Sequence, residues 1–209
     1  MASGRGIRRT IDGRDTSSCE QVDEALIGAI ASGEDYAMNR LYERHRVRVF
    51  RFILRIVGDV HLAEDLLSEV FLEVWRQAGT FKRRSQVSTW ILGIARFKAW
   101  SAGRQVRRDA DIDDIESLSI ADPADGPETA ALKMDRAVQL RRCLAQLSPE
   151  HREIIDLVYY HDKSVAEIAE IVGVPRNTVK TRMFYARKKL EGLLERQVDF
   201  GRVSGSQAA

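Results

Sequence analysis

Residues 164–190, SVAEIAEIVGVPRNTVKTRMFYARKKL, decide the fold of the second half of the chain. Apolar residues at helical spacing, Val165, Ile168 and Val172, predict a short amphipathic helix. The turn sequence Gly173-Val174-Pro175 follows, and a basic helix is expected after it. This order is typical of a helix-turn-helix, in which the second helix enters the major groove of DNA.

The second helix of this unit offers side chains that can donate hydrogen bonds to phosphates or base edges. They are Arg176, Asn177, Thr178, Lys180, Thr181 and Arg182. Val179 and Met183, four residues apart, are expected to face the core. The alternative is a pair of packed helices with a solvated charged face. However, residues 173–190 contain no Asp or Glu, and solvated faces usually carry both signs. The pattern favours binding to duplex DNA.

Charge is distributed unevenly along the chain. The 209 residues include 33 Lys+Arg and 31 Asp+Glu, which gives a net charge of only +2. Residues 74–108 contain basic side chains and no acid, whereas residues 109–128 contain acids, no Lys or Arg, and Pro123 and Pro127. The acidic stretch is expected to be a flexible, solvated linker. Fully extended, its ~20 residues reach roughly 60–70 Å.

The apolar periodicity predicts an all-α fold of two small helical domains joined by this acidic linker. Helices are expected over residues 22–32, 35–57, 60–78, 87–107, 129–147, 165–172 and 176–195, with a further one starting at Ser148. Asp59, Ser148 and Ser164 are expected to cap helices, and Glu167 completes a capping box with Ser164. The expected division is a disordered N-terminal tail (1–21), a first domain (22–108), the linker (109–128), a second domain (129–196) and a C-terminal tail (197–209).

The expected helix over residues 60–78 has an acidic face. It is formed by Glu64, Asp65, Glu69 and Glu73. Like charges four residues apart cost a few tenths of a kcal/mol per pair, and a partner rich in Arg or Lys would offset that cost. A merely solvated face is the alternative interpretation.

Aromatic residues alternate with basic ones in and beside the acid-free stretch. They are Trp75, Phe81, Trp90, Phe97 and Trp100. Basic side chains that follow a backbone, together with aromatic faces that stack on bases, form a surface for single-stranded nucleic acid. Trp75 and Trp90 are equally compatible with a place in the core.

Several other classes of protein are excluded or disfavoured. No apolar run approaches the ~20 residues that cross a bilayer, and the polar N-terminus is not expected to be a secretory signal.

The cysteines and histidines do not indicate a disulfide scaffold or a metal site. Two cysteines, Cys19 and Cys143, favour a reducing cytoplasm, and Cys143 is expected to be buried. The histidines lack metal-ligand spacing, and His151 and His161 are expected to be surface or cap residues. Without a P-loop or nucleophile motif, we expect no cofactor, metal, small-molecule substrate or enzymatic activity.

Three motifs together resemble bacterial sigma factors of the extracytoplasmic-function (ECF) group. Residues 63–75, AEDLLSEVFLEVW, resemble the helix of that family that binds core RNA polymerase. Phe81 and residues 88–96, STWILGIAR, are similar to the segment that melts and reads the −10 promoter element. Residues 147–153, 177–182 and 186–190 are similar to the domain that reads the −35 element. The motifs occur in the family's order, with a linker where the family has one.

The resemblance implies roles for individual residues. Binding to the polymerase clamp helices would fall to Glu64, Asp65, Ser68, Glu69 and Phe71. Binding to the −10 element would fall to Lys82, Arg83, Arg84, Trp90, Arg96, Lys98, Arg104, Arg107 and Arg108. Binding to the −35 element would fall to Arg176, Asn177, Thr178, Lys180, Thr181, Arg182, Phe184, Tyr185, Arg187 and Lys188. The two elements lie about 17 base pairs apart, a distance that the tether can span at about 3.4 Å per pair.

The chain departs from the family pattern at a few positions. Phe97, Ser101, Ser68 and Tyr185 stand where the family usually has Asn, Asp, Gln and Arg.

The resemblance also implies partners. They are core polymerase (clamp helices and flap), promoter DNA and an anti-sigma factor, and the expected setting is a stress response. A stand-alone helix-turn-helix regulator is the alternative function. Such regulators normally dimerise, and no dimer face is evident in the sequence.

Overall fold

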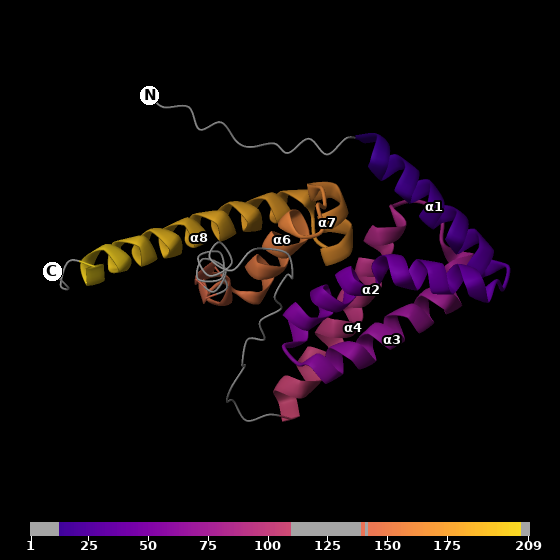
Figure 1. The fold of residues 1–209 in the computed structure, drawn as a ribbon, viewed down its shortest axis with the longest axis horizontal. Helices are drawn as coiled ribbons and strands as arrows, with labels where there is room; N and C mark the ends of the chain where they lie inside the picture. The colour runs from indigo at the N-terminus through magenta and orange to yellow at the C-terminus, as the bar shows by residue number, and fades with distance from the viewer. Residues whose placement is uncertain (1–12, 110–138, 141, 206–209) are drawn as a thin grey trace.

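The structure is a computed structural model that describes residues 13–109, 139–140 and 142–205 (Figure 1). The described residues form helices joined by short connections, and they contain no strand. The all-α prediction is therefore confirmed. Residues 110–128 of the expected linker and most of the expected helix over 129–147 lie outside the described residues, while Asp109 is the last residue of a helix.

The N-terminal module consists of α1 (Gly13–Ala31), α2 (Asp35–Val57), α3 (Val60–Gln77), the short 3-10 helix η1 (Ala78–Thr80) and α4 (Val87–Asp109). Helix α2 packs against α1, α3 and α4, and its fully buried Phe52 and Ile53 lie in the core. Helix α2 ends at Gly58, whose φ of 78° is left-handed and suits a residue without a Cβ. As predicted, the Asp59 side chain accepts the Leu62 N–H and caps α3.

The C-terminal module consists of α6 (Pro149–Tyr159), α7 (Val165–Val172) and α8 (Arg176–Gly205). The Ser148 side chain caps α6, with Pro149 in the first turn. The capping box of Ser164 and Glu167 forms at the start of α7, as the sequence predicts. Gly173 ends α7 with a left-handed φ of 70°.

Two helices are longer than expected. Helix α1 begins at Gly13, so it includes residues 13–21, which the sequence analysis assigned to a disordered tail. Contacts distant in sequence hold it, because Glu20 Oε1 accepts the Val87 N–H at 2.6 Å and the buried Asp23 bonds to His45 at 2.9 Å. Helix α8 continues to Gly205 instead of ending near residue 195. No proline interrupts it, and a glycine inside a helix costs only about 1 kcal/mol.

The two modules pack against one another. Helix α7 lies against α4, and α6 lies against the end of α2 (Figure 1). One cluster of buried apolar side chains extends through both modules, from Ile91 and Ala95 to Ile154 and Ile168. His161 is buried at this junction and its ring meets Phe52 edge-on at 5.4 Å, so its expected place at the surface is wrong.

Candidate nucleic-acid interface

The first turns of α8 present the polar side chains that the sequence assigns to duplex DNA. Val179 is fully buried and fixes the inner face of the helix. The opposite face is exposed or half-exposed, and it carries Arg176, Asn177, Thr178, Lys180, Thr181, Arg182, Arg187 and Lys188. The turn at Gly173 and Pro175 sets α8 across α7 in the helix-turn-helix arrangement. The basic face of this motif is thus fully formed.

Two aromatic side chains also stand out from α8. Phe184 and Tyr185 are 62% and 55% exposed, and their rings meet edge-on at 5.5 Å. Further along the helix, the Arg187 guanidinium lies over the Tyr159 ring of α6, 5.7 Å from its centroid. This contact holds Arg187 beside the recognition face.

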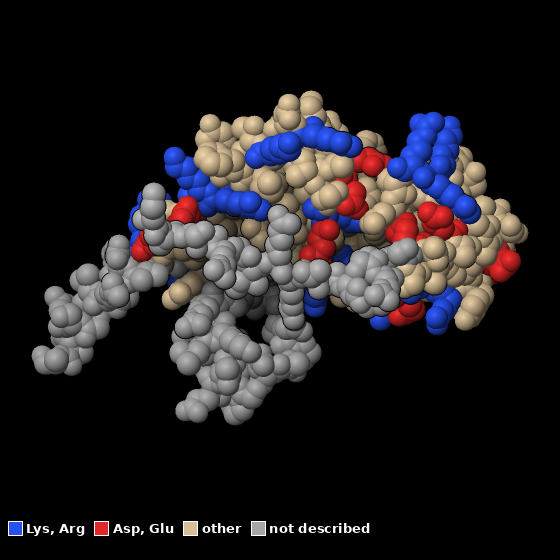
Figure 2. All heavy atoms as spheres, turned by 90° about the horizontal axis from the view of Figure 1, so that it is seen from above, with Lys and Arg blue, Asp and Glu red and all other residues tan. Residues whose placement is uncertain are grey.

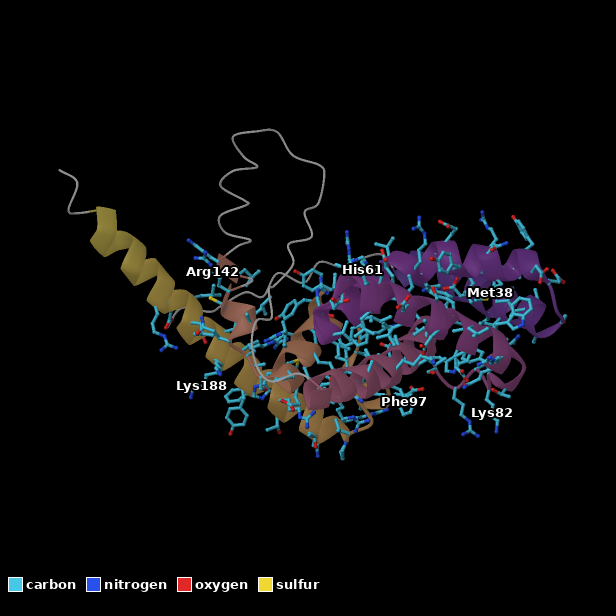
Figure 3. The ribbon with its side chains drawn as sticks, turned by 90° about the horizontal axis from the view of Figure 1, so that it is seen from below. Met38, His61, Lys82, Phe97, Arg142 and Lys188 are labelled. Atoms are coloured by element: carbon cyan, nitrogen blue, oxygen red, sulfur yellow. The ribbon has the colours of Figure 1, made fainter. Side chains whose placement is uncertain are left out.

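The connection before α4 and the exposed face of α4 form a second basic and aromatic surface. Lys82, Arg83 and Arg84 are all exposed, and Arg83 has a left-handed φ of 51°. Phe97 on α4 is 71% exposed, and Figure 3 shows Lys82 and Phe97 pointing outward along one edge of the molecule. Arg104 is exposed, whereas the side chains of Arg107 and Arg108 lie outside the described part of the structure. We name Lys82, Arg83, Arg84 and Phe97 the α4 surface.

Other residues predicted for this surface have partners within the protein. Trp90 is half-buried and packs on Phe81, with ring centroids 5.0 Å apart. It still lines an open groove of about 530 Å³ between α4 and α7, together with Phe97. Arg96 and Lys98 make ion pairs with Glu153 and Glu69 at 2.8 and 2.9 Å. The structure therefore turns Lys98 toward α3 and Arg96 toward the C-terminal module.

Helix α3 presents three of the four acids that the sequence places on one face. Glu64, Asp65 and Glu69 are exposed, as is Ser68 between them, whereas Glu73 is half-buried and accepts a hydrogen bond from Gln77 Nε2 at 2.5 Å. The neighbouring Leu66, Leu67 and Val70 are buried. We name these four exposed residues the acidic face of α3. A row of this kind can bind a basic protein surface.

Phe71 does not belong to this exposed surface. It is 4% exposed and meets Tyr42 edge-on at 4.8 Å, so its predicted contact with a partner is wrong. Phe71 lies on the buried side of the helix, four residues after Leu67 and three before Val74, both of which are also buried. Leu72 and Trp75 are 49% and 37% exposed and continue the stripe instead. The spacing 65, 68, 69, 72 and 75 was the sequence signal that could have revealed them.

Carboxylates lie close to the basic residues of both modules. Arg83, Arg84 and Arg176 line one recess of about 520 Å³ with Glu20, Glu24 and Glu167. Burial opposes ionisation of Glu167, but hydrogen bonds from Lys163, Ser164 and Thr89 outweigh it and lower its pKa to about 2. On the face shown in Figure 2, Lys and Arg form separate groups with Asp and Glu between them. The packed modules thus present no single basic track on that face.

The described residues contain no cluster of three or more His, Cys, Asp or Glu side chains suited to a metal ion. Within the same residues, no helix has the length and apolar character needed to cross a membrane. Cys143 is fully buried, as predicted.

Comparison with known proteins defines the class to which this arrangement belongs. The sequence matches the family description "Sigma-70 region 2" over residues 41–112 and "Sigma-70, region 4" over residues 137–190. It is 29% identical over 172 residues to the ECF RNA polymerase sigma factor SigL of Mycobacterium tuberculosis, covering 82% of this chain and 96% of SigL. It is 27% identical over 179 residues to the ECF sigma factor SigW of Bacillus subtilis, covering 82% and 96%.

Solved structures share the fold. The sigma factor RpoE of Bartonella quintana, crystallised with the anti-sigma factor NepR, superposes with a TM-score of 0.62 at 24% identity, covering 75% of this chain and 96% of RpoE. CnrH, solved with the cytosolic domain of CnrY, superposes with a TM-score of 0.61 at 22% identity, covering 83% and 97%. The chain thus combines a helix-turn-helix module with a second helical module that has acidic, basic and aromatic surfaces. This is the architecture of a transcription initiation factor. The chain belongs to the ECF group of the sigma-70 family of RNA polymerase sigma factors, which are not enzymes.

Proposed function

We propose that this sigma factor binds core RNA polymerase through the acidic face of α3, melts and reads the −10 element with the α4 surface, and reads the −35 element with α8. The observation that carries the proposal is the single row of exposed acids on α3 beside the basic and aromatic α4. A stand-alone DNA-binding protein has no use for that combination.

Asp65 is the strongest candidate for the polymerase contact. Lys98 already bonds to Glu69, whereas Asp65 is exposed one turn earlier on the same face. A basic segment of the polymerase clamp would neutralise both acids. Leu72 and Trp75 would add apolar contact at the end of the stripe.

The −10 contact follows from the aromatic and basic character of the α4 surface. Phe97 and the groove beside Trp90 offer faces on which extruded bases can stack, and Lys82 and Arg84 lie where they can neutralise the backbone. Unstacking a base costs a few kcal/mol, and its capture returns that free energy. Promoter melting by this chain is therefore binding without bond chemistry.

The C-terminal module also has a candidate surface for the polymerase flap. An apolar groove of about 940 Å³ lies between α6 and α8, lined by Leu144, Ile155, Tyr159, Leu190 and Leu194 among others. An amphipathic helix with an apolar face is the ligand that fits such a groove. The cytoplasm as the site of action, a stress-induced regulon and control by an anti-sigma factor complete the proposal. The structures of related sigma factors with anti-sigma factors support that control.

Run-off transcription with bacterial core polymerase on a pool of promoter fragments tests the proposal. The wild-type chain should produce new, discrete start sites, and Asp65→Arg should abolish them by reversing charge at the docking surface. Glu34→Arg, the same charge reversal at an exposed acid before α2 and outside the surfaces proposed for polymerase and DNA, is the matched control and should leave them. DNA binding without core polymerase, together with no new starts, would assign the chain to the stand-alone regulators.

A further inference from the structure

Helix α2 carries a row of arginines that none of the three surfaces described above uses. They are spaced four, four, three and four residues apart, and they are Arg40, Arg44, Arg48, Arg51 and Arg55. This spacing places the whole row on one side of the helix. After Glu43, no Asp or Glu follows in α2, so the helix itself supplies no acid to neutralise the end of the row.

Two members of the row have acidic partners on other helices. Arg44 bonds to Asp23 of α1 at 2.6 Å, and Arg55 pairs with Asp156 of α6. Both carboxylates are buried. The other three arginines are exposed or half-exposed, and they have no acidic partner among the described residues. We name these three the arginine face of α2: Arg40, Arg48 and Arg51.

The arginine face has dimensions that suit a nucleic-acid backbone. At a rise of about 1.5 Å per residue, Arg40 and Arg51 lie about 16 Å apart along the helix. At about 3.4 Å per phosphate, one strand of a duplex places about five phosphates beside a row of this length. Arginine presents a planar fork of donors that matches a phosphate, and α2 contains no lysine. The spacing and the residue type thus favour a phosphate backbone as the ligand.

Helix α1 lies between the arginine face and the basic connection that precedes α4. On one side of α1, Asp23 bonds to Arg44 at 2.6 Å and to His45 at 2.9 Å. On the other side, Glu24 lies 3.7 Å from Arg83. One helix diameter, about 10–12 Å, therefore separates the two basic surfaces. That distance corresponds to about three base pairs at about 3.4 Å per pair.

The exposed side of α1 is neutral. Its acids over residues 18–31 have partners, because Glu20 accepts the Val87 N–H at 2.6 Å and Asp23 and Glu24 bond to basic side chains. The longest exposed row of the helix consists of Gln21, Val22, Ala25 and Gly28. We name these four residues the neutral side of α1. A nucleic-acid backbone can pass close to them without meeting an unpaired carboxylate.

We propose that the arginine face of α2 binds the phosphate backbone of DNA that flanks the −10 element, and that this backbone passes over the neutral side of α1 between the α4 surface and α2. The contact positions the DNA and carries no sequence information, as is general for phosphate contacts. This inference rests on the proposed function, because the α4 surface determines where the −10 element lies.

The salt dependence of promoter binding by the reconstituted holoenzyme tests the contact. Fluorescence anisotropy measures the affinity for a promoter fragment with flanking DNA on both sides of the −10 element, at several salt concentrations. Arg40→Gln, Arg48→Gln and Arg51→Gln should each lower the slope of log K against log salt by about 0.7–0.9, and the triple variant by about 2–3. Arg46→Gln is the matched control and should leave the slope unchanged, because Arg46 lies on the opposite side of α2 and pairs with Glu43 at 3.0 Å.

A substitution on α1 tests the path of the backbone. Ala25→Glu adds an acid to the neutral side and should weaken binding several-fold at low salt, whereas Ala25→Gln should not. Equal affinities of these two variants would overturn the path. A probe cut back to the −10 element alone should give the wild type and the triple arginine variant equal slopes. A difference that persists on this short probe would place the arginines on the element itself and overturn the assignment to flanking DNA.

Unchanged slopes in the arginine variants would overturn the proposal. So would a loss of affinity for core polymerase with the DNA slope intact, which would assign the arginine face to an acidic protein surface. Circular dichroism must show unchanged helix content, and the single variants carry the test if the triple variant unfolds. In run-off transcription, normal start sites together with unchanged slopes would overturn this contact alone. If the wild-type chain gives no new start sites, the proposed function fails and this contact fails with it.

Discussion

Lys98 on α4 donates a hydrogen bond to Glu69 on α3 across 2.9 Å, so the basic helix and the acidic face of α3 are joined by an ion pair. The Glu69 side chain is 56% exposed, and pairs this exposed contribute only about 0–1 kcal/mol to stability. The pair therefore holds the two side chains close together but adds little to the stability of the fold. It also lowers the net charge that either surface presents.

Replacing Lys98 by Gln should lower the free energy of unfolding by less than about 1 kcal/mol, because water solvates Glu69 once its partner is removed. Urea unfolding followed by circular dichroism measures this. Glu69→Gln should give a similar value. A loss above about 2 kcal/mol in either variant would show that the pair is a structural contact.

Phe71 and Leu72 are neighbours in sequence with opposite expected effects. Phe71→Ala should destabilise the chain by about 3–4 kcal/mol, because it leaves a cavity beside Tyr42. Leu72→Ala should change stability by less than about 0.5 kcal/mol and weaken binding to core polymerase several-fold. Urea unfolding and a polymerase-binding titration separate the two effects. Equal loss of stability in both variants would contradict the assignment of the exposed stripe.

Glu167 should make the stability of the chain depend on pH below about 4.5. Its pKa is lowered from 4.5 to about 2, so its contribution is fully present above the unfolded value and is lost as pH falls from 4.5 toward 2. A shift of this size corresponds to about 3 kcal/mol. Urea midpoints measured between pH 6 and pH 3 should fall less steeply in Glu167→Gln than in the wild type. Identical slopes would refute the assignment.

Arg187 should contribute to duplex binding through the phosphate backbone. Arg187→Ala should weaken binding at low salt and lower the slope of log K against log salt by about 0.9 for one lost phosphate contact. Arg196, which lies further along α8 and bonds to the Gly192 carbonyl at 2.9 Å, provides the matched control. Arg196→Ala should leave the slope unchanged. Fluorescence anisotropy on a −35 duplex at several salt concentrations gives both slopes, and two equal slopes would exclude the contact.

Features set by neighbouring residues could be predicted from the sequence. The caps at Asp59, Ser148 and Ser164 depend on residues within one turn, and all three form where expected. The buried position of Val179 follows from helical spacing alone. The same local signals identified the acidic face of α3 and the exposed side of α8.

Features set by residues far apart in sequence could not be predicted. The early part of α1 is tied to the rest of the module through Glu20, whose partner Val87 lies 67 positions away. The burial of His161 depends on Phe52 and on the docking of the two modules. Glu153 is part of the LSPEHRE motif, and nothing in that motif shows that its carboxylate binds Arg96. Charge patterning indicated which segments are basic, but it did not indicate which charges neutralise one another.

The connection over residues 82–86 is held at both ends. Before it, the Phe81 N–H bonds to the Ala78 carbonyl at 3.2 Å. After it, the Val87 N–H bonds to Glu20 of α1 at 2.6 Å. Arg83 between them has a left-handed backbone and lies 3.7 Å from Glu24. Because α1 fixes the shape of this basic loop in advance, the strand capture proposed above would lose less conformational entropy, and Glu20 would contribute to affinity without touching DNA.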